Sequence, residues 1–174
     1  MSESGPGVDP SAASDPRLGL PPDAARDAAE ARRYPVRPIV GVGGIAFIDG
    51  QVVLIKRRFE PLAGGWSLPG GTLELGERLH EGLGREMREE TGLIVEVGPL
   101  VELFDRITRD DDGRVRFHYV LADYVCTPVG GELRAGSDVA NVVLASVDDL
   151  ARYDLTPKTL DVIACARRLT SVSP

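Results

Sequence analysis

Three glutamates on one side of an expected helix are the residues best suited to do chemistry in this chain of 174 residues. Residue types, and Gly92 in the usual position just past a helix end, predict a helix from about Arg78 to Thr91. Glu86, Glu89 and Glu90 occupy positions i, i+3 and i+4 of this helix. At that spacing their carboxylates should gather where a cation can be ligated.

The three carboxylates should lie close to the side of the helix that faces the protein. On a wheel at about 100° per residue, Leu79, Leu83 and Met87 define an apolar stripe, which the glutamates overlap or border. Three other charged residues fall on the opposite side, namely Glu81, Arg85 and Arg88. Carboxylates directed toward a protein body are costly unless a cation compensates them. The lack of a matching basic stripe therefore indicates a bound cation, and hard oxygen ligands favour Mg²⁺ or Mn²⁺.

A solvated helix face is the alternative interpretation of the charged run from Arg85 to Glu90. Runs of this kind more commonly form i, i+4 ion pairs in contact with solvent than bind a metal. The overlap of the acids with the apolar stripe favours the cation site in this case. Just before the helix, Pro69, Gly70 and Gly71 predict a loop whose backbone can approach a ligand closely.

Strands must position this helix and loop. Apolar, β-branched runs and turn residues predict two hairpins, one further strand and a C-terminal helix that begins at Thr156-Pro157. The predicted strands and helix are 39–48 with 52–55 across Asp49-Gly50, 101–108 with 114–125, 142–147, and 157 to about 169. Strands mixed with only two or three helices indicate an α/β (α+β) fold in which helices cover a sheet.

Composition and charge limit the possible functions. The chain is 43% hydrophobic and 27% charged, which is ordinary for a globular protein. A net charge of −7 argues against general binding to a nucleic-acid backbone, although a local basic or metal site can still hold a small anion. No run approaches the roughly 20 apolar residues that span a bilayer. We therefore expect neither nucleic-acid backbone binding nor a membrane anchor.

Two regions are expected along the chain. Residues 1–34 are predicted to be a disordered or marginally helical tail, because they are rich in Ser, Pro, Gly and Asp or lack an apolar face. Residues 35–172 should form one domain. Cys126 and Cys165 have apolar or small neighbours and no disulfide-like spacing, so they are interpreted as reduced thiols of a cytoplasmic protein.

The segment from Gly71 to Leu93 resembles the Nudix box, G-x5-E-x7-R-E-U-x-E-E-x-G-U, where U is a bulky apolar residue. Every fixed position is filled, by Gly71, Glu77, Arg85, Glu86, Met87, Glu89, Glu90, Gly92 and Leu93. Nine constrained positions over 23 residues make a chance match very unlikely. The resemblance implies the Nudix fold, a mixed β-sheet sandwiched between helices, and hydrolysis of a nucleoside diphosphate linked to another moiety.

The resemblance also assigns roles to the residues that match. Glu86, Glu89 and Glu90 are expected to ligate one or more divalent cations, Mg²⁺ or Mn²⁺, with the backbone carbonyl of Gly70 as a further ligand. Glu77 and Arg85 are expected to pair and to orient the helix and the loop. A diphosphate is anionic at its reacting centre, so bound cations would neutralise its oxygens and lower the pKa of the attacking water.

Candidate residues outside the box fall into two groups. Five candidates for substrate binding are Arg57, Arg58, Trp66, Arg116 and His118. Each also has a structural alternative: solvated arginines for the first two, loop packing for Trp66, and a satisfied structural histidine for His118. Candidates for a further acid that acts as ligand or general base are Glu132, Asp138 and residues 110–112. Asp138 is favoured because it follows Gly136-Ser137, a polar stretch in which an acid can move.

ADP-ribose or another nucleotide sugar is the first expected substrate. A modified nucleoside triphosphate of the 8-oxo-dGTP type is the second. Two rival functions are a nucleotide-sensing Nudix domain without turnover, which would be expected to lose box acids, and a prenyl diphosphate isomerase of the same fold, which would need a well-placed cysteine. Cys126 lies late in its expected strand and fits that role poorly. A homodimer is expected, because many relatives pair.

Overall fold

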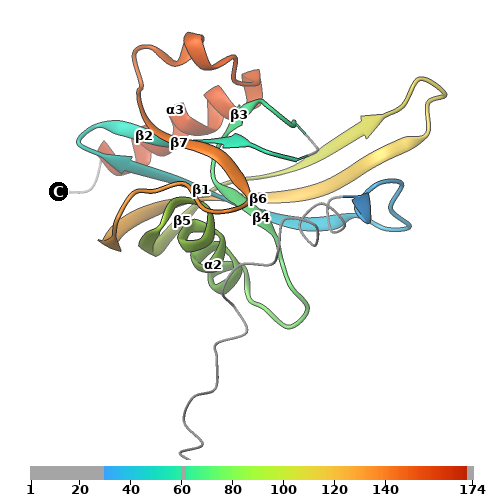
Figure 1. The fold of residues 1–174 in the computed structure, drawn as a ribbon, viewed down its shortest axis with the longest axis horizontal. Helices are drawn as coiled ribbons and strands as arrows, with labels where there is room; N and C mark the ends of the chain where they lie inside the picture. Colours follow the sequence, from blue (N-terminus) through green and yellow to red (C-terminus); the bar gives the residue numbers. More distant parts are fainter. Residues whose placement is uncertain (1–29, 60–61, 172–174) are drawn as a thin grey trace, which may run out of the picture.

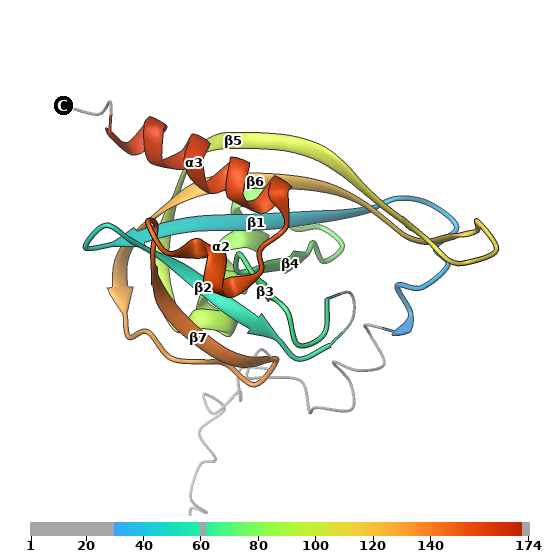
Figure 2. The ribbon, with the colours of Figure 1, turned by 90° about the horizontal axis from the view of Figure 1, so that it is seen from above.

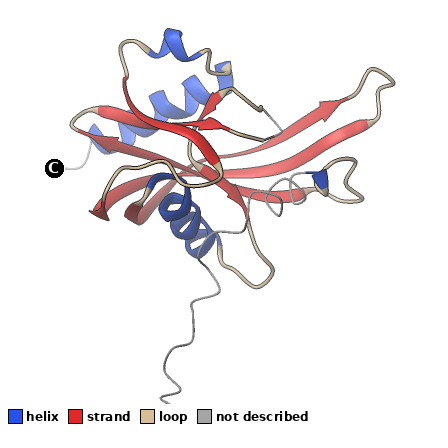
Figure 3. Ribbon diagram, in the orientation of Figure 1, coloured by secondary structure: helices blue, strands red, loops and turns tan. Residues whose placement is uncertain are grey.

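The computed structural model describes residues 30–59 and 62–171, so most of the tail expected at 1–34 lies outside the described residues. The described part forms a mixed sheet with helices on both faces (Figure 3). The elements are β1 (Ile39–Ile48), β2 (Gln51–Arg57), β3 (Trp66–Ser67), β4 (Gly70–Thr72), α2 (Leu79–Thr91), β5 (Leu93–Arg109), β6 (Val115–Gly131), β7 (Val139–Ser146), the 3-10 helix η1 (Leu150–Tyr153) and α3 (Pro157–Ser171).

The first predicted hairpin is confirmed. β1 and β2 pair antiparallel next to the turn, with Phe47 opposite Val52. Asp49 and Gly50 both have positive φ, 50° and 78°, which is the requirement of the tight turn favoured by a right-twisted hairpin. Away from the turn, β1 pairs in parallel with β6, from Ile39 to Ala46. β2 pairs antiparallel with β3 and β7. β1 therefore joins the two halves of the sheet.

The second predicted hairpin is also confirmed, but it is longer than predicted. β5 and β6 pair antiparallel over almost their whole lengths, and their outer ends form an arm that projects from the body of the protein (Figures 1 and 2). β5 begins at Leu93, directly after the left-handed Gly92 that ends α2. Register shifts between Val97 and Glu102 interrupt the period-2 pattern there, which explains why the sequence did not reveal the first half of this strand.

The loop expected at Pro69-Gly70-Gly71 is wrong in part. Gly70–Thr72 forms the short strand β4, which pairs antiparallel with β1. Gly70 has a φ of 140°, and a side chain there would collide with the backbone of Val42. Gly70, which suggested a loop, is thus the residue that allows the backbone of β4 to approach the backbone of β1.

Two helices cover the two faces of the sheet, as expected for the sandwich (Figure 1). α2 packs through Leu83 and Met87 on a cluster that includes Ala46 of β1. α3 packs on the other face through Val162 and Ile163. Within residues 30–59 and 62–171, no helix is long and apolar enough to cross a membrane.

The packing of α2 gives a stability prediction. Met87 is fully buried between α2 and the sheet. Met87→Ala should lower the free energy of unfolding by about 2–5 kcal/mol, since it removes buried atoms and leaves a cavity. Its exposed neighbour provides the control: Arg88→Ala should change stability by less than about 0.5 kcal/mol. Urea unfolding followed by circular dichroism measures both, and equal midpoints would contradict this packing of α2.

Candidate active site

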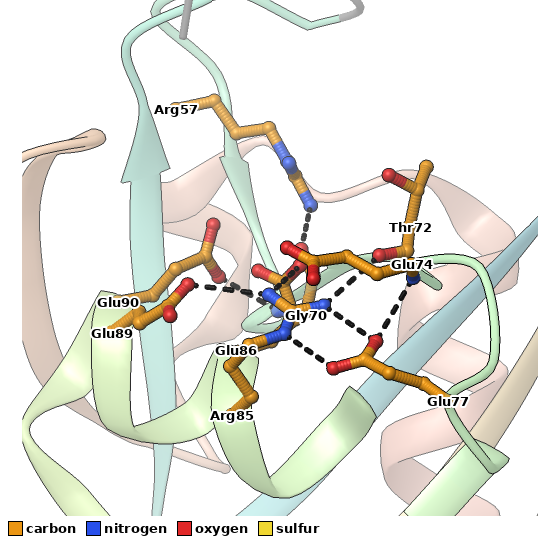
Figure 4. A network of polar contacts seen from close by, with 9 residues as sticks. All are labelled: Arg57, Gly70, Thr72, Glu74, Glu77, Arg85, Glu86, Glu89 and Glu90. Atoms are coloured by element: carbon orange, nitrogen blue, oxygen red, sulfur yellow. Dashed lines mark hydrogen bonds and ion pairs between the residues drawn. The ribbon is translucent and has the colours of Figure 1, made fainter. Parts of the chain in front are cut away.

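The glycine strand β4 and the helix α2 bring the box carboxylates to one place (Figure 4). The backbone N–H of Gly70 donates a hydrogen bond of 2.7 Å to Glu90 Oε2. The carboxylate of Glu86 occupies the space that a side chain at position 71 would fill. Glycine at 70 and 71 therefore lets two carboxylates of α2 lie against the backbone of β4.

Arg85 is the centre of the polar network in Figure 4. Its Nε and Nη2 donate to the two carboxylate oxygens of Glu77 at 2.7 and 2.9 Å, which is a bidentate pair. Its Nη1 donates to Glu86 at 2.9 Å and to Glu89 at 3.2 Å. Nη2 also donates to the carbonyl of Thr72, at 3.2 Å. A single guanidinium thus ties the loop before α2 to two box acids, and the predicted pair of Glu77 with Arg85 is present.

The helical-wheel argument for a cation was wrong in one respect. It placed Arg85 on the side opposite the acids, yet the arginine side chain is long enough to bend back to Glu86 and Glu89. Arg57 is a second cation beside the site, and its Nη2 donates 3.0 Å to the Gly70 carbonyl expected to ligate metal. The acids therefore have basic neighbours, so the case for a metal must come from the electrostatics of the buried acids and the chemistry of their oxygens.

The electrostatics of the site show that the acids need more positive charge than the protein supplies. Burial raises the pKa of Glu86, an effect that Arg85 opposes and the neighbouring Glu89 increases. Burial likewise raises the pKa of Glu90 to about 8, with Arg57 opposing and Glu86 adding to the shift. The pKa of Arg85 is itself raised, chiefly by its hydrogen bond to Glu77. Arg85 thus stays protonated, while burial raises the pKa of Glu86 and Glu90 and so disfavours their ionised forms.

A divalent cation fits this set of donors. Within the described residues, no three acids, histidines or cysteines are already arranged as a preformed metal cluster. Arg85 instead binds both Glu86 and Glu89. The available donors are carboxylate oxygens and a backbone carbonyl, which suit a hard cation. A cation would also favour the ionised form of the buried acids, which the protein by itself disfavours.

Among the acids outside the box, Asp138 acts electrostatically on the site. The loop before β7 packs on the end of α2 through a hydrogen bond of 3.1 Å from Gly136 N to the Glu90 carbonyl. The negative charge of Asp138 contributes to the raised pKa of Glu90. Its own Oδ1 accepts a hydrogen bond from Ser137. Asp110, in contrast, bonds to Arg114 within the β5–β6 turn, and Glu132 is an exposed residue just beyond β6.

The remaining substrate candidates lie in different places. Arg58 donates to the Val139 carbonyl at 3.2 Å, and Trp66 packs edge-to-face on Tyr153 with ring centroids 5.2 Å apart. Arg116 and His118 alternate with residues that face α3, so they lie on the other face of β6. Of the five substrate candidates, Arg57 is the one that the structure brings to the box carboxylates.

A cavity that the sequence did not reveal adjoins the site on the α3 face of the sheet. Its lining includes Gly70 and Arg57 of the site, together with the polar side chains of Arg106, Tyr119 and Asp123. The signal for Asp123 was available in the alternation of β6, where an acid follows a series of inward-facing apolar residues at a two-residue spacing. Arg106 lies in the predicted strand 101–108 opposite Tyr119, but the sequence does not show that this face of the strand borders a cavity.

Comparisons with known proteins agree with this geometry. Residues 37–164 match the NUDIX domain family. An ADP-ribose pyrophosphatase of Methanocaldococcus jannaschii is 36% identical over 127 residues, which cover 73% of this chain and 72% of that protein. The nucleoside triphosphatase NudI of Escherichia coli is 35% identical over 122 residues, covering 64% of this chain and 86% of that protein.

A solved structure gives the same assignment at the level of the fold. The crystal structure of a MutT NUDIX hydrolase from Burkholderia pseudomallei matches with a TM-score of 0.64 and 32% sequence identity, over 74% of this chain and 97% of that one. The chain therefore belongs to the NUDIX domain family and is a Nudix hydrolase.

Proposed function

We propose that this Nudix hydrolase cleaves a nucleoside diphosphate linked to another moiety, with ADP-ribose as its first substrate and Mg²⁺ or Mn²⁺ as its metal. The observation that carries the proposal is the gathering of Glu86, Glu89 and Glu90 beside the Gly70 turn. The choice of ADP-ribose is supported by the 36% identity to the archaeal ADP-ribose pyrophosphatase.

Four groups of this chain would hold the metal: the carboxylates of Glu86, Glu89 and Glu90, and the Gly70 carbonyl. When bound, a divalent cation neutralises diphosphate oxygens and lowers the pKa of the attacking water. Arg57, which already donates to the Gly70 carbonyl, also lines the cavity and adds positive charge beside the proposed metal ligands, where an anionic substrate would be held. This matters because the chain as a whole carries a net charge of −7.

The reaction requires one bond to form and one to break. The oxygen of water attacks one phosphorus, the P–O bond of the anhydride breaks, and the bridging oxygen leaves with the other phosphate. From ADP-ribose the products are AMP and ribose 5-phosphate. We assign acceptance of the water proton to Asp138, because the loop that carries it packs on the end of α2 through the hydrogen bond from Gly136 N to the Glu90 carbonyl.

Arg85 is a positioning residue in this proposal. Its bidentate pair with Glu77 fixes the loop before α2, and its other contacts orient two of the proposed metal ligands. Partners of metal ligands affect metal affinity and activity strongly although they do not touch the metal themselves.

A nucleoside triphosphate is a second candidate substrate. It is favoured by the 35% identity to the nucleoside triphosphatase NudI. The two candidates share the diphosphate and differ in what is attached to it, so a substrate panel distinguishes them.

Removing one ligand charge tests the proposed chemistry. Glu89→Gln should lower kcat by about 100-fold or more on the best substrate, because it weakens the stabilisation that a metal gives to the transition state. A phosphate-coupled assay measures kcat of both proteins with Mg²⁺ or Mn²⁺. The substrates are ADP-ribose, nucleotide sugars and 8-oxo-dGTP. Glu96→Gln makes the same chemical change at an exposed position of β5 and should keep wild-type activity. Inactivity of the wild type across the panel would refute the proposal.

The fork geometry of Arg85 gives a second test. Arg85→Lys keeps the charge but loses the bidentate bond to Glu77 and the bridge between Glu86 and Glu89. We expect kcat to fall by about 10-fold to 100-fold. The metal concentration for half-maximal activity should rise, whereas KM at saturating metal should change little. Wild-type kcat and metal dependence in this variant would show that charge alone suffices at position 85.

A further inference from the structure

The cavity beside the Gly70 turn has a floor made by three neighbouring strands. Its volume is about 110 Å³. On β1, Gly43 lies opposite Gly70 of β4 on one side and beside Asp123 of β6 on the other. β5 continues the floor with Arg106, which is paired with Tyr119 in the β5–β6 register. The three polar side chains of the interior therefore share one face of the sheet with the glycine turn.

Gly43 brings the Asp123 carboxylate close to the turn. A side chain at position 43 would collide with Asp123 Oδ1, so this carboxylate lies over the backbone of β1. Adjacent strands are spaced about 5 Å apart, so only about one strand spacing separates the carboxylate from Gly70. The carboxylate is thus near the position where a diphosphate would be held.

Asp123 and Tyr119 have polar groups without protein partners. They are 7% and 6% exposed. Within residues 30–59 and 62–171, no hydrogen bond is made to the Asp123 carboxylate, and the buried Tyr119 hydroxyl also has no partner. Burial raises the pKa of Asp123 to about 6, with Glu102 adding to the shift and Arg106 opposing it, so the carboxylate form predominates at neutral pH. Buried polar groups are nearly always hydrogen-bonded, so the unpartnered Tyr119 hydroxyl, in one cavity with a carboxylate to which no protein group donates, calls for a ligand.

We propose that Asp123 and Tyr119 form a sugar subsite, which binds the hydroxyl groups of the sugar attached directly to the substrate's diphosphate. The proposal rests on the function proposed above and names the part of the substrate that binds in this cavity. An ionised carboxylate only accepts hydrogen bonds, and adjacent sugar hydroxyls can donate two to it. The short separation from Gly70 fits the sugar, which follows the phosphate after a few covalent bonds. The outer edge of a nucleobase lies farther away.

Arg106 completes the subsite. Burial and the nearby Arg57 lower its pKa, and within the described residues no carboxylate lies within ion-pair distance of its guanidinium. A guanidinium has five N–H donors and no acceptor, so it suits a sugar oxygen or a phosphate oxygen. The cavity therefore offers an acceptor, a hydroxyl and a donor, which together match the mixed hydrogen-bonding capacity of a sugar ring.

A purely structural role for Asp123 predicts a different result on substitution. Burying an ionised carboxylate without hydrogen bonds opposes folding. Asp123→Asn removes that charge at nearly constant size and should leave the unfolding midpoint unchanged or higher. Tyr119→Phe removes a hydroxyl without a partner and should also fold normally. Loss of sugar recognition with no loss of stability is the signature of a binding group.

The test uses the substrate that the wild-type protein hydrolyses best, its analogues that each lack one hydroxyl of a sugar next to the diphosphate, and an analogue with a changed base. In the wild type, we expect loss of one particular hydroxyl to raise KM about tenfold. In Asp123→Asn the ratio of KM without this hydroxyl to KM with it should fall to near one, while the effect of the base change on KM stays as in the wild type. Tyr119→Phe should reduce the ratio partly. The control Asp105→Asn, at an exposed position next to Arg106, should retain the full ratio.

Two results would overturn the sugar subsite while leaving the proposed function standing. One is an unchanged hydroxyl ratio in Asp123→Asn. The other is a changed ratio for the base analogue instead, which would mean that the carboxylate reads a nucleobase. If the wild type hydrolyses none of the compounds, the proposed function fails and the subsite fails with it.

Discussion

The close approach of α2 to the two glycines of β4 is the constraint on which the site depends. Glu86 and Glu90 can lie against β4 only because positions 70 and 71 are glycines. β4 in turn can lie against β1 only because Gly70 adopts a backbone conformation that other residues avoid. A single Cβ at either glycine would displace a proposed metal ligand or the strand itself. The glycines of the family motif therefore set the spacing between α2 and β4, and the charge of its acids can act at the site only because of that spacing.

That spacing concentrates negative charge where the protein can only partly compensate it. Arg85 and Arg57 supply fixed positive charge from two sides, yet the pKa values of Glu86 and Glu90 remain raised by burial. Such a site is electrostatically incomplete, and functional sites commonly have this property. A divalent cation and an anionic diphosphate would complete it together, since each compensates the other. The neighbouring cavity has a similar property. Its buried acid, Asp123, has a pKa raised by burial and receives no hydrogen bond from the described residues.

Much of the fold follows from local patterns, whereas the details of the site depend on tertiary contacts. The Asp49-Gly50 turn and α2 were predictable because turn chemistry and helical periodicity are local. Three features were not. A helical wheel ignores side-chain length, so it misplaced Arg85 relative to the acids. The pairing of Gly70 with β1 involves a partner far away in sequence. The cavity lined by Arg106 and Asp123 also involves β1 and β4, so no local pattern in β5 or β6 reveals it.

The central claim is that the carboxylates of α2 bind a divalent cation, and the most direct test is Mn²⁺ binding without any nucleotide. Electron paramagnetic resonance of free Mn²⁺ during a titration gives the affinity of the wild type and of Glu90→Gln. The account predicts that the wild type binds Mn²⁺ and that the variant binds it at least about tenfold more weakly, because a buried anionic ligand is lost. Equal affinities for the two proteins would contradict the account, because the metal would then be held elsewhere.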